Sequence, residues 1–301
     1  MIKVVKNVRD ANCITHNGTM HADEVFATAF LELYIDNVRV YRTSSIDNLE
    51  INDKAFVYDI GRGKFDHHQP DALKRDNGIT YSSFGLLWKE FGRDFLIKRG
   101  IYNIDEVFNG IDKDFIEAID ADDNGFFPKI EAIYKVKTIS NMIKLFNPSF
   151  ESDENESDQF LKAVEVAKMI FEEEILYVYG KVIADKKVLD VINSMEKDSK
   201  YLILDEYLPY EDTILNNEEA NSILFVAFPS NRGGYAIKTI SKSLEDKTAR
   251  MDFPEEWGGL DGEELEKISN IKGLRFCHIG RFIVSCDSLE AVYQVFDKLC
   301  K

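Results

Sequence analysis

A strand that runs into a loop of acidic residues and histidines constrains this chain more than any other feature. Residues 55–58 are apolar, and a short apolar run is typical of a buried strand in a parallel sheet. Asp59 follows directly, and a glycine-containing turn then leads to Asp66, His67 and His68. Open α/β sheets place their ligands at the carboxyl ends of their strands, so we expect these side chains at such an edge. Carboxylates with imidazoles suit a divalent transition metal.

A second loop of the same kind lies closer to the start of the chain. Residues 11–15 are typical of a short strand, and His16, His21 and Asp23 follow it. A helix with apolar residues at helical spacing comes next, and another strand is expected over 38–41. Strand, helix and strand in this order predict βαβ units and a parallel sheet. Four of the five histidines thus lie in two loops that follow strands, which scattered surface histidines would rarely do.

A third group of acidic residues ends a helical stretch and completes the pattern. Asp120, Asp122 and Asp123 stand just before Gly125, a residue that commonly ends a helix. At least one of the three is expected to be a metal ligand. Together the loops offer enough ligands for two metal ions that share one aspartate. Two divalent ions about 3.5–4 Å apart stabilise both the attacking and the leaving oxygen of a phosphoryl displacement. The simpler alternative is a polar loop whose histidines only cap neighbouring backbone.

Charge and cysteine content narrow the function classes. The net charge of −17 argues against avid, sequence-independent binding of duplex nucleic acid. It leaves open a nuclease that holds the end of one strand through metal ions. The four cysteines show no CxxC spacing, and the first residues do not resemble a signal peptide, so we expect a cytoplasmic protein. No apolar run approaches the roughly 18 residues of a membrane span.

The length of 301 residues suits two domains. An acidic, polar segment over 151–158 is the best boundary. We expect a metal-binding catalytic domain over 1–150, a helical linker over 151–198 and a substrate-binding domain over 199–301. Periodicity and turn residues predict helices over 80–91, 104–120, 138–146, 159–195 and 288–299, and strands over 201–204, 222–228, 235–240 and 275–286.

The motifs occur in the order HNGxxHxDE, DxG, DHHQ and DAxDNG, and the segments PEEWGGL and FCH follow near the end. This order, over nearly the whole chain, resembles the family named for melanocyte proliferating gene 1. That family belongs to the DHH phosphoesterase superfamily, with RecJ-type exonucleases and manganese-dependent inorganic pyrophosphatases. The resemblance implies an α/β fold with a DHH-type parallel-sheet N-terminal domain and a helical linker. A smaller α+β C-terminal domain and an active site in the interdomain cleft are implied too.

The resemblance also implies roles for the metal ligands. His16 and His21 would bind one ion, Asp23 and His67 would bind the other, and Asp59 would bridge the two. The ions would be two divalent cations, Mn²⁺ by preference, with Mg²⁺ as the alternative.

The remaining roles in the site follow from the same resemblance. Asp120 or Asp123 would complete the second metal site. His68 would face the substrate phosphate, and Asp66 would orient the histidines from behind. Family members are described as 3′-5′ RNA exonucleases, so single-stranded RNA or a short oligonucleotide is the expected substrate.

A locally basic segment in the C-terminal part is the candidate grip for that substrate. Residues 231–250 carry five basic and two acidic side chains, a net charge of +3 within a chain of −17. Arg232, Gly233 and Gly234 would offer a guanidinium and bare backbone amides to a phosphate, and the alternative is a plain hairpin turn. We also expect His278, in the FCH segment, to contact the substrate.

The sequence therefore predicts a divalent-metal-dependent phosphodiesterase that acts as a 3′-5′ exonuclease on single-stranded RNA by two-metal hydrolysis. Two alternatives stay open. One is another phosphohydrolase, of the pyrophosphatase or cyclic-dinucleotide type. The other is a metal-bearing interaction protein without catalysis.

Overall fold

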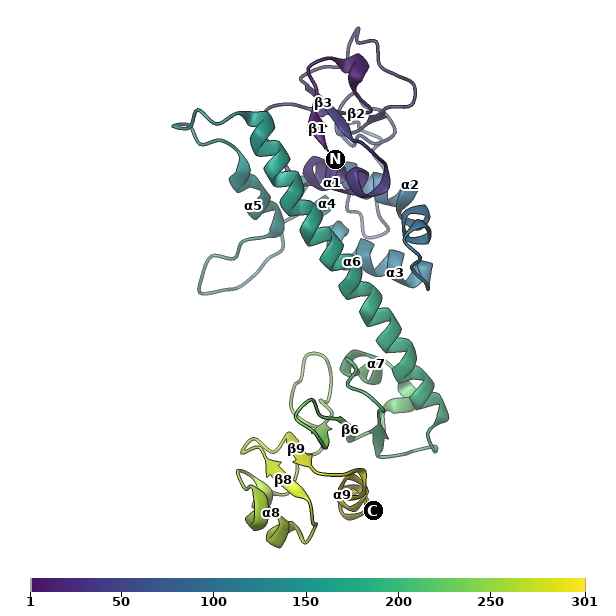
Figure 1. Ribbon diagram of the computed structural model, residues 1–301, viewed down its shortest axis with the longest axis vertical. Coiled ribbons are helices and arrows are strands. Elements are labelled where there is room, and N and C mark those ends of the chain that lie inside the picture. Colours follow the sequence, from purple (N-terminus) through teal and green to yellow (C-terminus); the bar gives the residue numbers. More distant parts are fainter. Residues whose placement is uncertain (1, 301) are drawn as a thin grey trace. The chain divides into compact units, whose positions relative to one another are not determined.

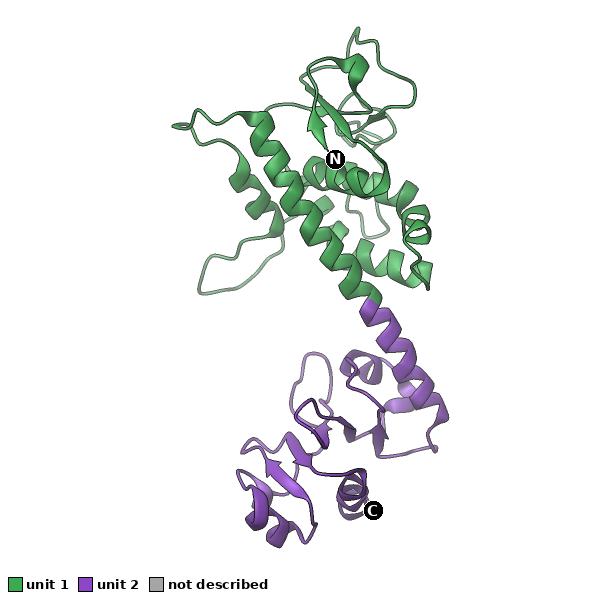
Figure 2. Ribbon diagram, viewed as in Figure 1, with its two compact units in different colours: residues 1–179 green, residues 180–301 purple. Residues whose placement is uncertain are grey.

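The computed structural model describes residues 2–300 and divides into two compact units, residues 1–179 and 180–301 (Figure 2). The division falls inside one long helix, α6 (Glu156–Ser194), which has 39 residues. A helix of this length matches the continuous helical pattern expected over 159–195.

Unit 1 is built on a four-stranded parallel sheet with strand order β1-β3-β2-β4. Figure 1 labels three of these strands, β1, β2 and β3. The predicted α/β class with a parallel sheet is confirmed. The central strand β2 pairs with β3 on one side and with β4 on the other, through Ile14 opposite Tyr41 and Val57. The strands are β1 (Lys3–Val4), β2 (Cys13–His16), β3 (Arg39–Thr43) and β4 (Phe56–Val57).

Helices surround an aromatic core in unit 1. Phe30 of α1 packs edge-on against Trp88 and Phe95 of α2 and against Phe171 of α6, with ring centroids 5.4–6.3 Å apart. A π-helical turn interrupts the helical stretch predicted over 104–120, and such turns are often found at functional sites. The helices are α1 (Ala22–Tyr34), α2 (Ser83–Lys98), α3 (Ile104–Ile111), the π turn (Asp112–Ile116), α4 (Glu117–Asp123) and α5 (Ile139–Ile143).

Unit 2 contains a five-stranded mixed sheet of order β5-β6-β7-β9-β8, parallel between β5 and β6 and antiparallel elsewhere. The single strand predicted over 275–286 was wrong, because a turn over 278–281 folds this segment into a hairpin. The elements are β5 (Tyr201–Ile203), α7 (Glu211–Leu215), β6 (Phe225–Pro229), β7 (Tyr235–Thr239), α8 (Gly262–Ser269), β8 (Leu274–Cys277), β9 (Ile283–Cys286) and α9 (Leu289–Leu299).

The two faces of this sheet are covered to different extents. Side chains alternate between the faces of a strand, so Phe225 and Ala227 join one core cluster while Val226 and Phe228 join another. The first cluster contains residues of α8 and α9 and of the four strands β6, β7, β8 and β9. The second joins β5, β6 and part of β7 to α7 and the end of α6, and it contains no buried residue of β8 or β9. The second face is therefore less covered over β8 and β9.

All four cysteines are free thiols, and three of them are buried. Burial raises the pKa of the Cys13 thiol to about 12, so this side chain stays protonated and unreactive. Among residues 2–300, no helix combines the length and the apolar character that crossing a membrane requires.

Candidate metal centre

Two neighbouring strands deliver the first residues of the site to the same edge of the sheet. His16 is the last residue of β2, and Asp59 comes two residues after β4, the strand that pairs with β2. Asp59 has a positive φ of 55°, which is unfavourable for a residue with a side chain. Its N–H donates to the carbonyl of Phe65 over 3.0 Å, which fixes this conformation. Strained residues of this kind cluster at functional sites.

The Asp59 carboxylate lies between two imidazoles and is only 3% exposed. One oxygen, Oδ2, is 3.0 Å from His16 Nε2, and the other, Oδ1, is 3.1 Å from His67 Nε2. Burial alone would raise the pKa of Asp59, but its hydrogen bonds to His16 and His67 outweigh this effect and lower the pKa to about 2. A carboxylate that turns each oxygen to a different histidine has the arrangement that a bridging ligand needs.

Both histidines are held so that their Nε2 atoms face the cluster. His16 Nδ1 is 2.9 Å from the backbone carbonyl of Asn17, and His67 Nδ1 is 3.2 Å from Asn124 Oδ1. The amide nitrogen of Asn124 donates to the carbonyls of Thr80 and Asp120, which leaves its oxygen toward His67. An acceptor at Nδ1 favours the tautomer whose Nε2 lone pair is free for a metal.

Further carboxylates crowd the same space. Asp23 and Glu24, in the first turn of α1, are fully buried, and Asp123 Oδ2 is 3.2 Å from His67 Nε2. Burial and then the charge of Asp23 raise the pKa of Asp123 to about 8, while burial also raises the pKa of Asp23 and of Glu24. Without a cation this cluster can exist only by taking up protons, so its charge pattern fits a bound divalent metal.

An orphaned oxygen supports the same interpretation. Asp23 Oδ2 accepts a hydrogen bond from Ser83 Oγ over 2.8 Å, but no donor among the described residues reaches the buried Oδ1. A buried carboxylate oxygen without a partner is costly, and a metal ion would satisfy it. Four groups of three residues each offer ligand atoms that lie within 4.8 Å of one another inside the group: His16, His21, Glu24; Asp59, His67, His68; His21, Asp23, Asp123; and Asp23, Glu24, Asp59.

The DHH segment separates a buried histidine from an exposed one. Asp66 Oδ1 is 2.6 Å from His68 Nδ1 and accepts the N–H of His67 over 2.7 Å. Asp66 Oδ2 accepts the N–H of Arg62 over 2.5 Å. The side chain of His68 is 59% exposed, whereas that of His67 is 6% exposed. Asp66 therefore fixes the His68 ring by its Nδ1 and leaves Nε2 on the open side.

Comparison with known proteins places almost the whole chain in one family. Residues 12–299 match the MYG1 exonuclease profile, described as "Uncharacterised protein family (UPF0160)". The chain belongs to the MYG1 family. The MYG1 protein of Dictyostelium discoideum is 30% identical over 304 residues, which cover 91% of this chain and 92% of that protein. The MYG1 protein of Chlamydia trachomatis is 28% identical over 298 residues, covering 95% and 96%. The MYG1 exonuclease of Rattus norvegicus is 25% identical over 303 residues, covering 89% and 79%. No solved structure gives a significant match.

The aspartates of the DAxDNG motif take different positions in this MYG1-family chain. Asp123 lies in the cluster, but Asp120 does not belong to any of the four ligand groups. The Asp120 carboxylate accepts hydrogen bonds from Ser82 Oγ (2.6 Å) and from the guanidinium of Arg75 (2.7 Å). Asp122 Oδ2 accepts the hydroxyl of Thr138 over 2.6 Å. Of the three aspartates in this motif, only Asp123 belongs to a ligand group among the described residues.

The buried pair of Asp120 and Arg75 connects the elements that carry residues of the cluster. Asp120 also accepts the N–H of Gly85 over 3.2 Å, and a Cβ atom on Gly85 would lie 2.2 Å from the carboxylate. Arg75 Nη2 reaches Asp112 in the π turn over 2.9 Å. This network ties α4, which carries Asp123, to the start of α2, which carries the Ser83 that holds Asp23.

His21 lies at the rim, since its side chain is 54% exposed and its Nδ1 is 3.6 Å from Asp123 Oδ1. Glu24 is absent from the predicted ligands, although it stands in the HNGxxHxDE motif and enters two of the ligand groups. Its oxygens accept the N–H of His21 over 2.9 and 3.0 Å. The sequence signal that could have identified Glu24 as a ligand is its position beside Asp23 in the first turn of a helix.

The candidate substrate residues lie in unit 2. Gly233 and Gly234 form the turn between β6 and β7, and the N–H of Gly233 donates to the carbonyl of Ser230 over 2.9 Å, which corresponds to the hairpin alternative. His278 is in the turn between β8 and β9, where its Nδ1 accepts the N–H of Gly280 over 2.9 Å. Arg232 is exposed beside the glycines. The structure thus assigns the Gly233 amide to the turn.

Proposed function

We propose that this chain is a divalent-metal-dependent phosphodiesterase, a 3′-5′ exonuclease that acts on single-stranded RNA or short oligonucleotides. The observation that carries the proposal is the buried cluster around Asp59, whose two oxygens face two imidazoles while further carboxylates crowd them. The names of the rat and mouse relatives, MYG1 exonuclease, support a nuclease-type hydrolase. The DHH-type arrangement that the motifs resemble supports the same chemistry.

Two divalent cations fit the donors of the cluster, and mixed carboxylate and imidazole ligands favour Mn²⁺ over Mg²⁺. We assign His16, His21 and Glu24 to one ion and Asp23, His67 and Asp123 to the other, with Asp59 shared. Of Asp120 and Asp123, we choose Asp123 for this assignment, because the Asp120 carboxylate already accepts hydrogen bonds from Arg75 and Ser82. When bound, such ions stabilise the attacking and the leaving oxygen of a phosphodiester during hydrolysis.

The residues of the chain prepare the site for that chemistry. Asn124 and the carbonyl of Asn17 hold the histidine rings with Nε2 inward, so little reorganisation is needed when cations bind. Asp66 holds the His68 ring at Nδ1, and the exposed Nε2 can donate to a phosphate oxygen when the ring is protonated. A fixed donor of this kind stabilises the charge that develops on the phosphate.

Residues of unit 2 would bind the rest of the substrate in this proposal. Arg232 and His278 remain the candidates for phosphate contacts, whereas Gly233 and Gly234 shape the turn that presents Arg232. The guanidinium of Arg250 donates hydrogen bonds to the carbonyls of Ala220, Asn221 and Ile223. We therefore do not include Arg250 among the substrate-binding residues.

The direct test is incubation of the purified protein with Mn²⁺ and a single-stranded RNA labelled at its 5′ end. We expect a ladder of products that shorten by one nucleotide from the 3′ end, and we expect EDTA or Asp59→Asn to abolish it. Pyrophosphate and a cyclic dinucleotide are the parallel substrates. Hydrolysis of either of these, without cleavage of RNA, would replace the exonuclease with the phosphohydrolase alternative. Bound metal without hydrolysis of any substrate would favour the interaction protein.

A further inference from the structure

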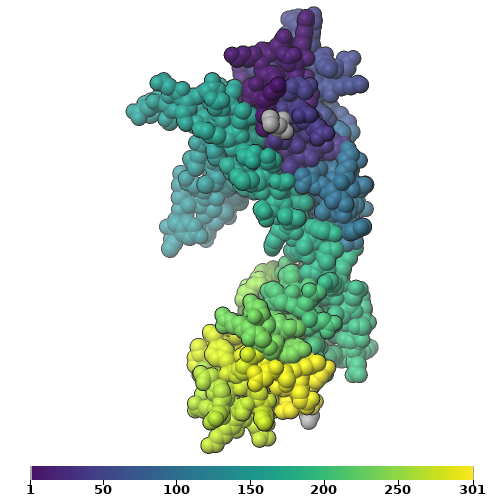
Figure 3. All heavy atoms as spheres, viewed as in Figure 1, coloured from purple at the N-terminus to yellow at the C-terminus, as the bar shows by residue number. Residues whose placement is uncertain are grey.

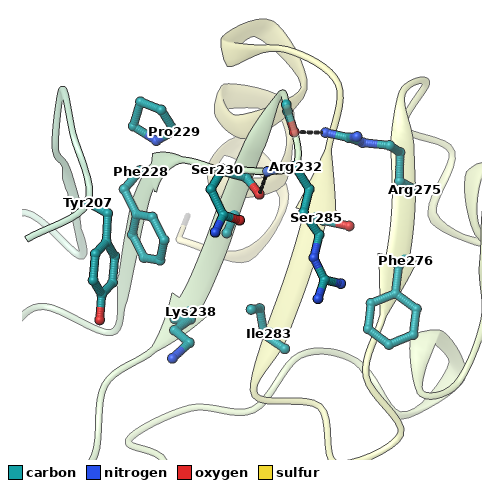
Figure 4. A pocket seen from close by; sticks show the side chains of 13 residues that line it. Tyr207, Phe228, Pro229, Ser230, Arg232, Lys238, Arg275, Phe276, Ile283 and Ser285 are labelled. Carbon is teal, nitrogen blue, oxygen red and sulfur yellow. Dashed lines mark hydrogen bonds between the residues drawn. The ribbon is translucent and has the colours of Figure 1, made fainter.

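Unit 2 contains a pocket of about 540 Å³ on the less covered face of its sheet (Figure 4). This volume falls within the roughly 300–1,000 Å³ typical of small-molecule sites. Its wall comes from β6, β7, β8 and β9, from the loop that follows β6, and from Tyr207 in the loop after β5. All of its lining residues belong to unit 2, so the pocket lies within that unit.

The charge of this pocket is the reverse of the charge of the chain. Thirteen residues line it, and three are basic (Arg232, Lys238 and Arg275) while none is acidic. The chain as a whole has 54 acidic and 37 basic residues, so an all-basic set of charges is unexpected here. Among residues 2–300, no carboxylate forms an ion pair with Arg232 or Lys238, whereas Arg275 pairs with Asp287. Two cations thus remain available for an anion.

The loop that carries Arg232 is tightly constrained. The N–H of Arg232 donates to Ser230 Oγ over 3.2 Å, and the N–H of Ser230 donates to the carbonyl of Gly234 over 2.9 Å. Arg275 donates to the carbonyl of Gly233 and to that of Cys286. Gly234 has a φ of 65°, and a Cβ atom there would lie 2.1 Å from the Cys286 carbonyl oxygen, so the loop packs directly on β9. Arg232 extends from this loop over the sheet (Figure 4).

Aromatic and apolar groups share the pocket with the cations. Phe276 of β8 is 40% exposed, and Tyr207 is 63% exposed with its ring edge-on to Phe228 at 5.1 Å. Ala236 and Ile283 supply apolar surface between them. Exposed aromatic rings stack on nucleobases, and a guanidinium forms bidentate hydrogen bonds with a phosphate.

We infer that this pocket binds a nucleoside monophosphate unit, with Arg232 and Lys238 on the phosphate and Phe276 and Tyr207 on the base. The inference rests on the proposed function for its substrate class, because it identifies the unit of a single-stranded chain that unit 2 binds. It goes beyond the proposed function in one respect. None of the lining residues is a metal ligand, so the pocket binds a free nucleoside monophosphate without any metal.

The test is isothermal titration calorimetry of the full chain in EDTA with three probes: adenosine 5′-monophosphate, adenosine and ribose 5-phosphate. We expect one saturable site for adenosine 5′-monophosphate and at least ~10-fold weaker binding of the two fragments, each of which lacks one half of the recognition. Arg232→Ala should weaken the binding of adenosine 5′-monophosphate at least ~10-fold and leave the binding of adenosine unchanged. Phe276→Ala should weaken the binding of adenosine 5′-monophosphate and of adenosine, but not the binding of ribose 5-phosphate.

Both substituted side chains are exposed, so neither change should unfold the protein. The matched controls are Arg9→Ala and Lys272→Ala, which remove exposed cations outside the pocket and should bind the nucleotide as the unchanged chain does. No saturable binding of adenosine 5′-monophosphate, or equal binding by Arg232→Ala, would overturn the inference.

A second assay separates this inference from the proposed function. A small chromogenic phosphodiester with Mn²⁺ reports on the metal cluster alone. If it is hydrolysed but the nucleotide does not bind in EDTA, the pocket assignment fails and the phosphodiesterase stands. If the nucleotide binds but neither RNA nor the small diester is hydrolysed, the pocket stands and the proposed function fails.

Discussion

The metal cluster of unit 1 and the pocket of unit 2 are opposite in both charge and exposure. In unit 1, the carboxylates of Asp23, Glu24 and Asp59 are at most 3% exposed and share their space with imidazoles. In unit 2, Arg232 and Lys238 line a pocket without a carboxylate and are not buried. Figure 3 draws the heavy atoms of the chain as spheres, coloured by residue number. Buried carboxylates crowd the first region, whereas no acidic residue lines the second.

The difference in burial decides how each region behaves without its ligand. Buried like charges are costly, so the cluster must hold protons where metal ions would sit, and the raised pKa of Asp123 reports this. Exposed cations keep their hydration and cost little. We therefore expect metal removal to change unit 1 strongly, and nucleotide removal to leave unit 2 nearly unchanged.

The largest effect should come from Asp59→Asn. A single amide cannot replace a carboxylate that faces both His16 and His67, so both metal sites should weaken together. We expect the rate of RNA hydrolysis to fall at least ~10³-fold, which corresponds to about 4 kcal/mol of barrier. Metal analysis of the dialysed protein should show a parallel loss. Binding of adenosine 5′-monophosphate in EDTA is the control, and it should not change.

His68→Ala should act on the rate without acting on the metal. The ring is 59% exposed and its hydrogen bond goes to Asp66, so its loss should leave the buried ligands in place. We expect roughly 10²-fold slower hydrolysis, the usual cost of one removed donor to a developing charge. Loss of bound metal as complete as in Asp59→Asn would contradict this division of roles.

Asn124→Ala tests the support behind the ligands. The Asn124 oxygen fixes the His67 ring, and such outer partners typically change metal affinity by about 10- to 100-fold. We expect weaker Mn²⁺ binding by titration calorimetry, with activity recovered at high Mn²⁺. Asn77→Ala, which removes an exposed hydrogen bond to Glu117, is the matched control. Unchanged Mn²⁺ affinity in Asn124→Ala would show that His67 does not need this partner.

Arg232→Ala tests the second region during catalysis. Arg232 belongs to unit 2 and is not a metal ligand. Its removal should therefore raise the KM for RNA about 10-fold with little change in kcat. The small chromogenic diester, which contains no nucleoside monophosphate unit, should be hydrolysed as before. A fall in kcat for both substrates would mean that Arg232 acts in the chemistry and not in the grip.

The smallest effect concerns the stability of the metal-free protein. Hydrogen bonds and charges from Asp59 and neighbouring carboxylates outweigh burial and raise the pKa of His16 and His67 from 6.5 to about 9. Their stabilisation is fully present below pH 6.5 and is lost as the pH rises through 9. Asp123, with a pKa raised from 3.8 to about 8, changes stability in the same direction. Asp59 has the opposite sign, but its pKa of about 2 lies below this window.

We therefore expect the melting temperature in EDTA to fall between pH 6.5 and pH 9, by roughly 2–4 °C for each kcal/mol lost. With Mn²⁺ the fall should disappear, because the ligands bind metal only when deprotonated. Differential scanning calorimetry with and without Mn²⁺ measures both curves. Identical curves would contradict a cluster that exchanges protons for metal.

Much of the fold and the location of the cluster follow from the sequence, for a simple reason. Polar residues that interrupt an apolar strand at its carboxyl end stand out, and parallel strands bring such ends together. This is how His16, Asp59 and His67 were predicted to lie close, and their contacts in the structure agree with that proximity. The helical segments stand out by their spacing in the same way.

The choice among the DAxDNG aspartates could not be made from sequence. Each residue in a helix turns the side chain by about 100°, so the direction of Asp120 or Asp123 depends on the helix phase. The π turn at Asp112–Ile116 shifts that phase, and no residue pattern announces it. Arg75, which is distant from Asp120 in the sequence, then donates a hydrogen bond to its carboxylate, and the sequence does not indicate this pairing. Glu24 was missed for a related reason, since acidic residues are common in the first turn of any helix.

The central claim is that the buried cluster binds two divalent cations. Crystals of the metal-free protein soaked in Mn²⁺ and measured at the manganese absorption edge test it directly. We expect two anomalous peaks, one on each side of the Asp59 carboxylate, and none in the pocket of unit 2. Peaks only at surface carboxylates, or no peak beside Asp59, would contradict the claim.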